Sequence, residues 1–106
     1  MVLRNGIEKW YYKCGVLKGL NPYKDGKIDG VVKVYYVNGV LASKQQFSNG
    51  KKDGLIKSYY KCGALELIAP FRADKKNGLV RRYYETGLLK SEKNYQEGSL
   101  ISQKMF

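Results

Sequence analysis

The sequence predicts an all-β fold in which antiparallel β-hairpins stack side by side into one elongated sheet. Three observations predict it: a repeat that recurs every 24 residues without a slip, a glycine near the end of each turn, and no window with a helical apolar period of comparable length. We treat residues 1–106 as a single domain. Its repeats span 6–29, 30–53, 54–77 and 78–101, and they leave a C-terminal remainder at 102–106.

Each repeat begins with a glycine and a short run of β-branched and aromatic residues, which is typical of a strand. The run ends in a pair of tyrosines, and a glycine follows three residues after the pair. In the second repeat this turn contains Asn38-Gly39. That dipeptide predicts a two-residue type I′ turn, because both central positions of such a turn need a positive φ.

A second run of about eight residues follows each turn and predicts the return strand of the hairpin. Polar loops such as SNGKKDG then lead into the next repeat. Eight strands about 4.8 Å apart would form a sheet roughly 40 Å long. Along the last full strand, Lys90, Glu92 and Lys93 are charges of the kind that discourage pairing between sheet edges.

The chain carries a net charge of +11, from 20 basic and 9 acidic residues. Such a charge attracts acidic partners of every kind, whether an acidic protein, nucleic acid or anionic lipid. The alternative is that the charge only keeps the protein soluble. No apolar stretch is long enough to cross a membrane, and the first residues lack the apolar core of a secretory signal. We therefore expect a cytoplasmic protein, and leave open a leader removed before this numbering begins.

The side chains that most enzymes use are scarce. The chain has no histidine, its nine acidic residues mostly neighbour lysines, and no glycine cluster joins a strand to a helix. We expect no catalytic residues, no metal site, no cofactor and no small-molecule substrate. Cys14 and Cys62 occupy the same position two repeats apart, about 19 Å across a regular sheet, so we expect two free thiols.

One face of the predicted sheet is a candidate binding surface. Side chains alternate along a strand, so the first, third and fifth residues after each opening glycine share a face. The tyrosines there can pack with lysine stems lying over them, or the row can bind an acidic protein groove or single-stranded nucleic acid. Residues 30–77 carry nine basic and three acidic residues, so a partner should lie over the middle. The candidate residues are Lys9, Lys33, Lys57, Arg81, Tyr11, Tyr35, Tyr59 and Tyr83.

The unit GxxxxYYxxGxL, followed by an aromatic residue and a loop such as YKDGKIDG, resembles the MORN-variant repeat of bacterial proteins often classed as antitoxin components. The resemblance covers residues 2–100. It implies a row of stacked hairpins and a binding module without known catalytic residues, and the broader MORN group is linked with membrane lipids and protein assembly. The chain departs from the pattern where ADKKN replaces the loop glycine and where Ser102 replaces the second glycine of the last loop.

Three functions follow from these observations. We favour, mostly through the resemblance, an antitoxin-like or immunity-like protein that binds and neutralises a toxin or effector, with an acidic protein as the partner. The alternatives are a binder of nucleic acid or anionic membrane lipid and a structural scaffold. The oligomeric state stays open.

Overall fold

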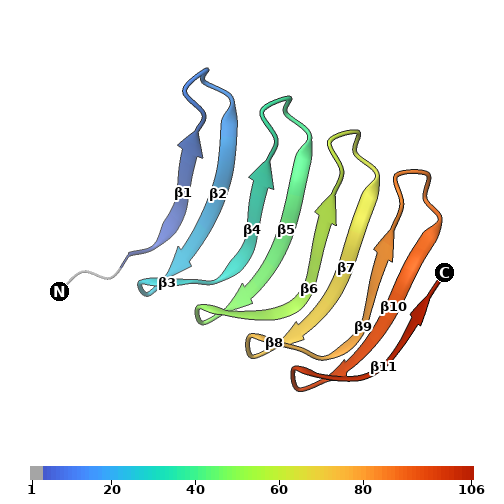
Figure 1. The fold of residues 1–106 in the computed structure, drawn as a ribbon. Coiled ribbons are helices and arrows are strands. Elements are labelled where there is room, and N and C mark those ends of the chain that lie inside the picture. Colours follow the sequence, from blue (N-terminus) through green and yellow to red (C-terminus); the bar gives the residue numbers. More distant parts are fainter. Residues whose placement is uncertain (1–3) are drawn as a thin grey trace.

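The computed structural model describes residues 4–106, and these form one open antiparallel sheet without a helix (Figure 1). The predicted all-β fold of stacked hairpins is confirmed. Nine strands follow one another across the sheet in the order β1-β2-β4-β5-β6-β7-β9-β10-β11, while the short β3 and β8 pair with β2 and β7. The molecule measures 49 × 33 × 14 Å, so it is elongated and one sheet thick.

The strands keep the repeat pattern of the sequence from one end of the sheet to the other. Their bounds are β1 Gly6–Tyr11, β2 Leu17–Lys24, β3 Lys27–Ile28, β4 Gly30–Tyr35, β5 Leu41–Ser48, β6 Lys51–Tyr59, β7 Leu65–Arg72, β8 Lys75–Lys76, β9 Gly78–Tyr83, β10 Leu89–Gln96 and β11 Ser99–Met105.

The turn after each tyrosine pair differs from the predicted type I′ turn. Tyr36 donates its backbone N–H to the carbonyl of Val40, and Gly39 donates its own to the carbonyl of Tyr36, at 2.8 and 2.9 Å. Gly39 has a φ of 88°, whereas Asn38 keeps a negative φ. The loop is therefore a three-residue connection with a single left-handed residue, and the prediction for Asn38-Gly39 is wrong. The same two hydrogen bonds recur in the other three repeats.

Two-residue turns with positive φ at both positions occur at the opposite end of the hairpins, in the polar loops. Asn49 and Gly50 have φ values of 50° and 80°, which fit a type I′ turn. In each of these turns the second residue donates its N–H to a carbonyl 22 residues earlier in the chain, as Gly50 does to Ile28 at 2.7 Å. The turns are therefore also contacts between repeats. The other three are Asp25-Gly26, Ala73-Asp74 and Glu97-Gly98.

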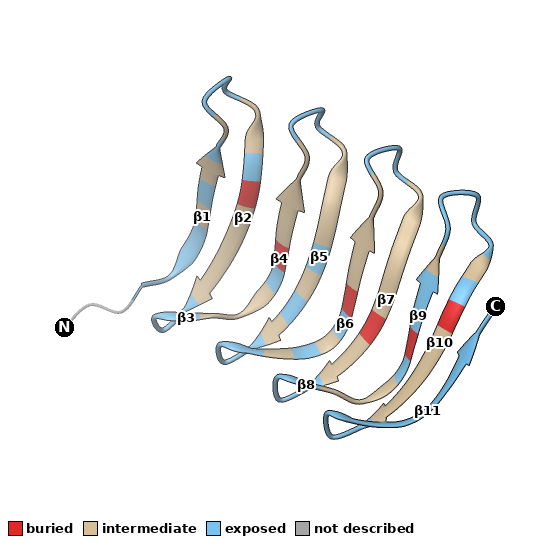
Figure 2. Cartoon of the chain, viewed as in Figure 1, coloured by how far each residue is buried: buried red, intermediate tan, exposed pale blue. Residues whose placement is uncertain are grey.

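Among residues 4–106, the buried side chains lie on one face of the sheet. Ile56, Ala69 and Val80 form a small buried cluster, against which Leu67, Phe71 and Tyr95 pack. Figure 2 shows the buried residues as single bands near the middle of the strands. At the N-terminal end, the ring of Trp10 covers Gly19 so closely that a Cβ there would lie 3.1 Å from it. We call this side, with Val32, Ile56, Ala69, Val80 and Ser91, the packed face.

The C-terminal edge of the sheet lies one strand beyond the one expected. Because β11 pairs with β10, the strand that carries Lys90, Glu92 and Lys93 is an inner strand and not the edge of the sheet. The expectation that these three residues protect an edge is wrong. The reason is that residues 99–105 form a strand of their own, which pairs with β10.

Candidate functional site

The eight predicted site residues lie on the side of the sheet opposite the packed face, on the first strand of each repeat. We call this side the lysine face. Lys9 and Arg81 are exposed, while Lys33 and Lys57 are half-buried near the centre of the sheet. The residues directly after the four opening glycines are exposed beside these cations: Ile7, Val31, Leu55 and Leu79. The lysine face therefore offers a basic row and an apolar row side by side.

Strand register adds a cation that the sequence analysis missed. Lys44 on β5 lies directly opposite Lys33 on β4 and, on its other side, directly opposite Lys57 on β6. Three lysines thus follow one another across three neighbouring strands, which are about 4.8 Å apart. The 24-residue repeat relates only equivalent strands of different repeats, whereas Lys44 lies on the return strand of its hairpin. Aligning the two strands of the hairpin with each other would have placed Lys44 beside Lys33.

Like charges placed directly opposite one another destabilise a sheet unless water or an anion compensates them. No ion pair within residues 4–106 involves Lys33, Lys44 or Lys57. The two ion pairs of this part of the chain are Arg4 with Glu8 and Arg81 with Glu92. The three lysines therefore leave a concentrated positive charge at the centre of the lysine face.

The positive charge weakens toward both ends of the row. Arg81 lies opposite Glu92, and its Nε donates to the Glu92 carboxylate at 3.2 Å. Ile68 separates Lys57 from Arg81, and Leu20 separates Lys9 from Lys33. The predicted ladder of four equivalent cations is therefore uneven, and its centre lies over β4, β5 and β6.

A shallow hollow of about 190 Å³ lies beside this centre. Its walls combine charge with apolar surface, since the side chains of Val31 and Leu55 are 42% and 48% exposed. A protein side chain with a carboxylate and an apolar neighbour would find both complements here. The lining residues are Val31, Lys44, Gln46, Leu55 and Lys57.

The tyrosine row of the lysine face offers less open ring surface than the sequence suggested. Tyr11 is exposed, but Tyr35, Tyr59 and Tyr83 are half-buried. Stacking of bases needs exposed ring faces, so this arrangement offers a poor platform for single-stranded nucleic acid.

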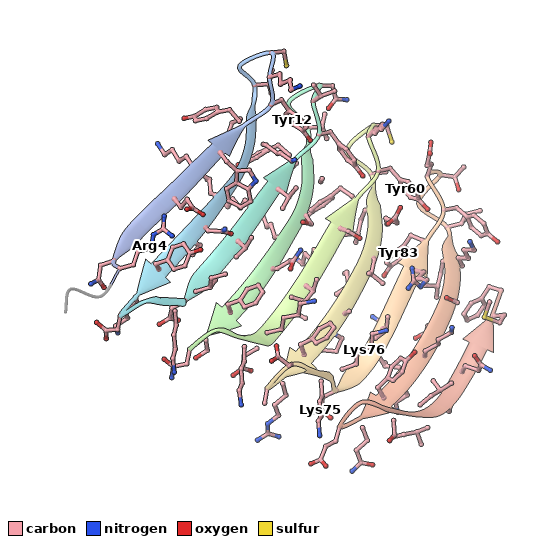
Figure 3. The ribbon with its side chains drawn as sticks, turned by 60° about the vertical axis from the view of Figure 1, so that its left-hand side comes forward. Arg4, Tyr12, Tyr60, Lys75, Lys76 and Tyr83 are labelled. Atoms are coloured by element: carbon pink, nitrogen blue, oxygen red, sulfur yellow. The ribbon has the colours of Figure 1, made fainter. Side chains whose placement is uncertain are left out.

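In the first three repeats, the second tyrosine of the pair links one repeat to the next. The hydroxyl of Tyr60 donates to the backbone carbonyl of Tyr83 at 2.6 Å, and Figure 3 shows the two residues on neighbouring repeats. Tyr12 and Tyr36 make the same bond to Tyr35 and Tyr59. Burial raises the pKa of Tyr60, and Glu66 and Glu85 raise it further, so its phenol remains a proton donor at neutral pH. The tyrosine pair is therefore a structural feature.

Both cysteines are free and exposed, at the hairpin tips of the first and third repeats. This agrees with the expectation of two free thiols. Within the part of the chain that the structure describes, no group of three histidine, cysteine, aspartate or glutamate residues is placed to hold a metal ion. Among residues 4–106 there is also no helix long and apolar enough to cross a membrane.

The repeats match a known family. A model of the MORN repeat variant matches residues 4–25, 28–49 and 76–97, which together make up more than half of the chain. The stretch between the second and third matches contains Ala73-Asp74, the turn that lacks glycine. No curated protein matches the chain significantly.

Proposed function

The chain belongs to the MORN repeat variant family, and from that premise we propose that it is a non-enzymatic binding module that recognises an acidic protein through the lysine face. MORN repeats are commonly binding modules. Within that class we favour an antitoxin or immunity role, in which the chain binds and neutralises a toxin or effector. We place the interaction in the cytoplasm, where the exposed thiols of Cys14 and Cys62 would stay reduced.

The observation that carries this proposal is the run of three directly opposed lysines, Lys33, Lys44 and Lys57. A sheet gains nothing for its own stability from such a run, because like charges opposite one another are destabilising. A partner that supplies carboxylates would turn this repulsion into attraction. Charge complementarity of this kind raises association rates and selects partners more than it adds raw affinity.

A protein partner fits the lysine face better than nucleic acid does. The lysines flank exposed Val31 and Leu55, and the cores of protein interfaces combine apolar contact with a polar rim. Nucleic acid would instead use stacked bases, for which the half-buried Tyr35 and Tyr59 offer little surface. An anionic membrane shares the basic and apolar requirements, so it is a separate outcome of the test.

The experiment is an affinity capture from the native host, run with and without nuclease, and the recovered proteins are identified by mass spectrometry. The bait is the wild-type chain or the triple variant K33Q/K44Q/K57Q. A control variant, K24Q/K51Q/K75Q, also loses three positive charges. These lysines are exposed and lie directly beside the two-residue turns, away from the centre of the lysine face. The proposal expects one acidic protein with the wild type and the control, and its loss with the triple variant.

Three other results would contradict the proposal. Equal capture by all three baits would show that the lysine face does not bind. A steep loss of capture on nuclease treatment would point to nucleic acid. Binding of the wild type to anionic vesicles, with no protein recovered, would support the membrane alternative. A toxin-like reading frame beside the gene would favour the antitoxin role over the scaffold.

A further inference from the structure

The C-terminal edge of the sheet is unusually apolar for an edge strand. Every residue of β11 is exposed, and Lys104 is the one charged residue between Ser99 and Met105. Natural edges are commonly protected by charges, prolines or bulges, because their free N–H and C=O groups pair readily with other strands. The exposed apolar side chains are Leu100 at 47%, Ile101 at 55%, Met105 at 66% and Phe106 at 62%.

This edge differs from the inner strands because it lacks a glycine. The opening glycines of the four repeats have φ values between 104° and 117°, which side chains with a Cβ rarely adopt. Ser102 takes the equivalent position 24 residues after Gly78, and it has no positive φ. The bend at the opening glycine is therefore missing from β11.

From Ser102 onward, the register of β11 differs by one residue from that of the inner strands. In the inner pair β5–β6, Ser43 lies opposite Ser58, and the same positions two repeats later are 91 and 106. The structure instead pairs Ser91 with Met105. A shift of one residue moves each side chain to the other face of a sheet. The last strand is therefore not a copy of the inner ones.

The free backbone groups of β11 follow from its pairing with β10. Phe106 donates its N–H to the carbonyl of Lys90, so the groups of Phe106 point toward β10. Because these groups alternate in direction along a strand, those of Met105 and Gln103 point away from β10. Gln103 lies near the middle of the strand and presents a free donor and a free acceptor at the open edge.

We propose that β11 pairs with β11 of a second copy of this chain, antiparallel, about a twofold axis at Gln103. The two Gln103 residues then exchange both backbone hydrogen bonds. In this register Met105 faces Ile101 of the second copy on both sides of the axis. The bulge of β11 between Leu100 and Ser102 ends the regular pairing there, so Leu100 and Phe106 lie outside it. Lys104 falls opposite Ser102, so no like charges meet.

The other edge of the sheet does not have this complementarity. On β1 the N–H of Tyr12 points toward β2, so by alternation the backbone groups of Lys9 point outward. An antiparallel pair of β1 strands centred there would place Lys9 opposite Lys9, which is unfavourable. A β1 pair centred at Lys9 is therefore unfavourable, whereas the β11 pair centred at Gln103 brings no like charges together.

The dimer extends the sheet without covering the lysine face. A twofold axis perpendicular to the sheet reverses the strands and keeps the two lysine faces on the same side. The proposal is therefore independent of the proposed function, and it would give the dimer two binding surfaces in one plane.

Analytical ultracentrifugation of the full chain over a concentration series tests the proposal. The expected result is a reversible dimer, whose dissociation constant rises at least tenfold in Gln103→Pro, because proline removes the free N–H at the axis. Lys9→Pro is the matched control on the other edge, and it should leave dimerisation unchanged. A wild-type monomer at all concentrations, or a dimer that Gln103→Pro leaves intact, would overturn the proposal.

A second pair of variants tests the register and does not depend on proline. Ile101→Lys should weaken the dimer at least tenfold, since it replaces the apolar contact with Met105 of the second copy. The double variant I101K/M105E should restore the dimer, because the new lysine and glutamate then face one another across the axis. If the double variant is as weak as Ile101→Lys, or weaker, the proposed register is wrong.

Discussion

The Nζ of Lys76 lies 5.0 Å from the ring centroid of Tyr95, which is 19 residues further along the chain. The same relationship holds one repeat earlier between Lys52 and Phe71, at 5.2 Å, and at the start of the sheet for Arg4 and Tyr23. In three of the four repeats, a cation thus lies over the aromatic residue found 19 positions further along the chain. These three cations therefore contribute to the stability of the sheet through cation–π contacts.

Lys76→Ala should lower the free energy of unfolding by about 0.5–1 kcal/mol, the usual range for a cation over an aromatic ring at a partly exposed site. Lys75→Ala is the matched control, because Lys75 is the neighbouring exposed lysine and covers no ring. Urea unfolding followed by circular dichroism measures both variants. Equal effects of the two substitutions would show that the contact with Tyr95 adds nothing.

Tyr36→Phe should cost about 0.5–1.5 kcal/mol of stability, since it removes a single hydrogen bond and keeps the ring. The bond lost is the one at 2.6 Å from the Tyr36 hydroxyl to the carbonyl of Tyr59. Tyr84→Phe is the control, because the Tyr84 hydroxyl donates no hydrogen bond within residues 4–106. Thermal unfolding of both variants decides the matter, and a control as destabilised as Tyr36→Phe would contradict the assigned role.

Ala73→Asn should stabilise the chain by about 0.5–1 kcal/mol. Ala73 has a φ of 48°, a left-handed conformation that costs most residues about 1–2 kcal/mol and that asparagine tolerates better. Asn49 occupies the equivalent position in the second repeat, at a φ of 50°. The same substitution at Ala64, which has a negative φ, should give no such gain. A midpoint of urea unfolding that is unchanged or lower in Ala73→Asn would refute the assignment.

The fold was predictable from the sequence because glycine positions and the 24-residue period depend on local backbone geometry. The turn types were less predictable. Asn38-Gly39 and Asn49-Gly50 look alike as dipeptides, yet only the second takes positive φ at both residues. The dipeptide alone does not give the loop length, which depends on where the flanking strands pair.

The candidate site was predictable only in part, for a similar reason. Lys33 and Lys57 follow from the repeat, whereas Lys44 joins them only through the register between strands. The pairing of Arg81 with Glu92 also depends on that register, and it removes one of the predicted free cations. A single sequence specifies which residues share a face more readily than which residues meet across strands.

The central claim is that Lys33, Lys44 and Lys57 bind an acidic protein. Isothermal titration of the captured protein tests it most directly, with the wild-type chain, K33Q/K44Q/K57Q and the control K24Q/K51Q/K75Q. Exposed charge pairs contribute up to about 1 kcal/mol each, so the triple variant should bind at least about tenfold more weakly. Its thermal stability should be equal to or higher than that of the wild type, because the repulsion between the opposed lysines is removed. The control should bind within about twofold of the wild type, because nonspecific charge steering falls off within a Debye length. An equal loss in both variants, or no loss in either, would contradict the claim.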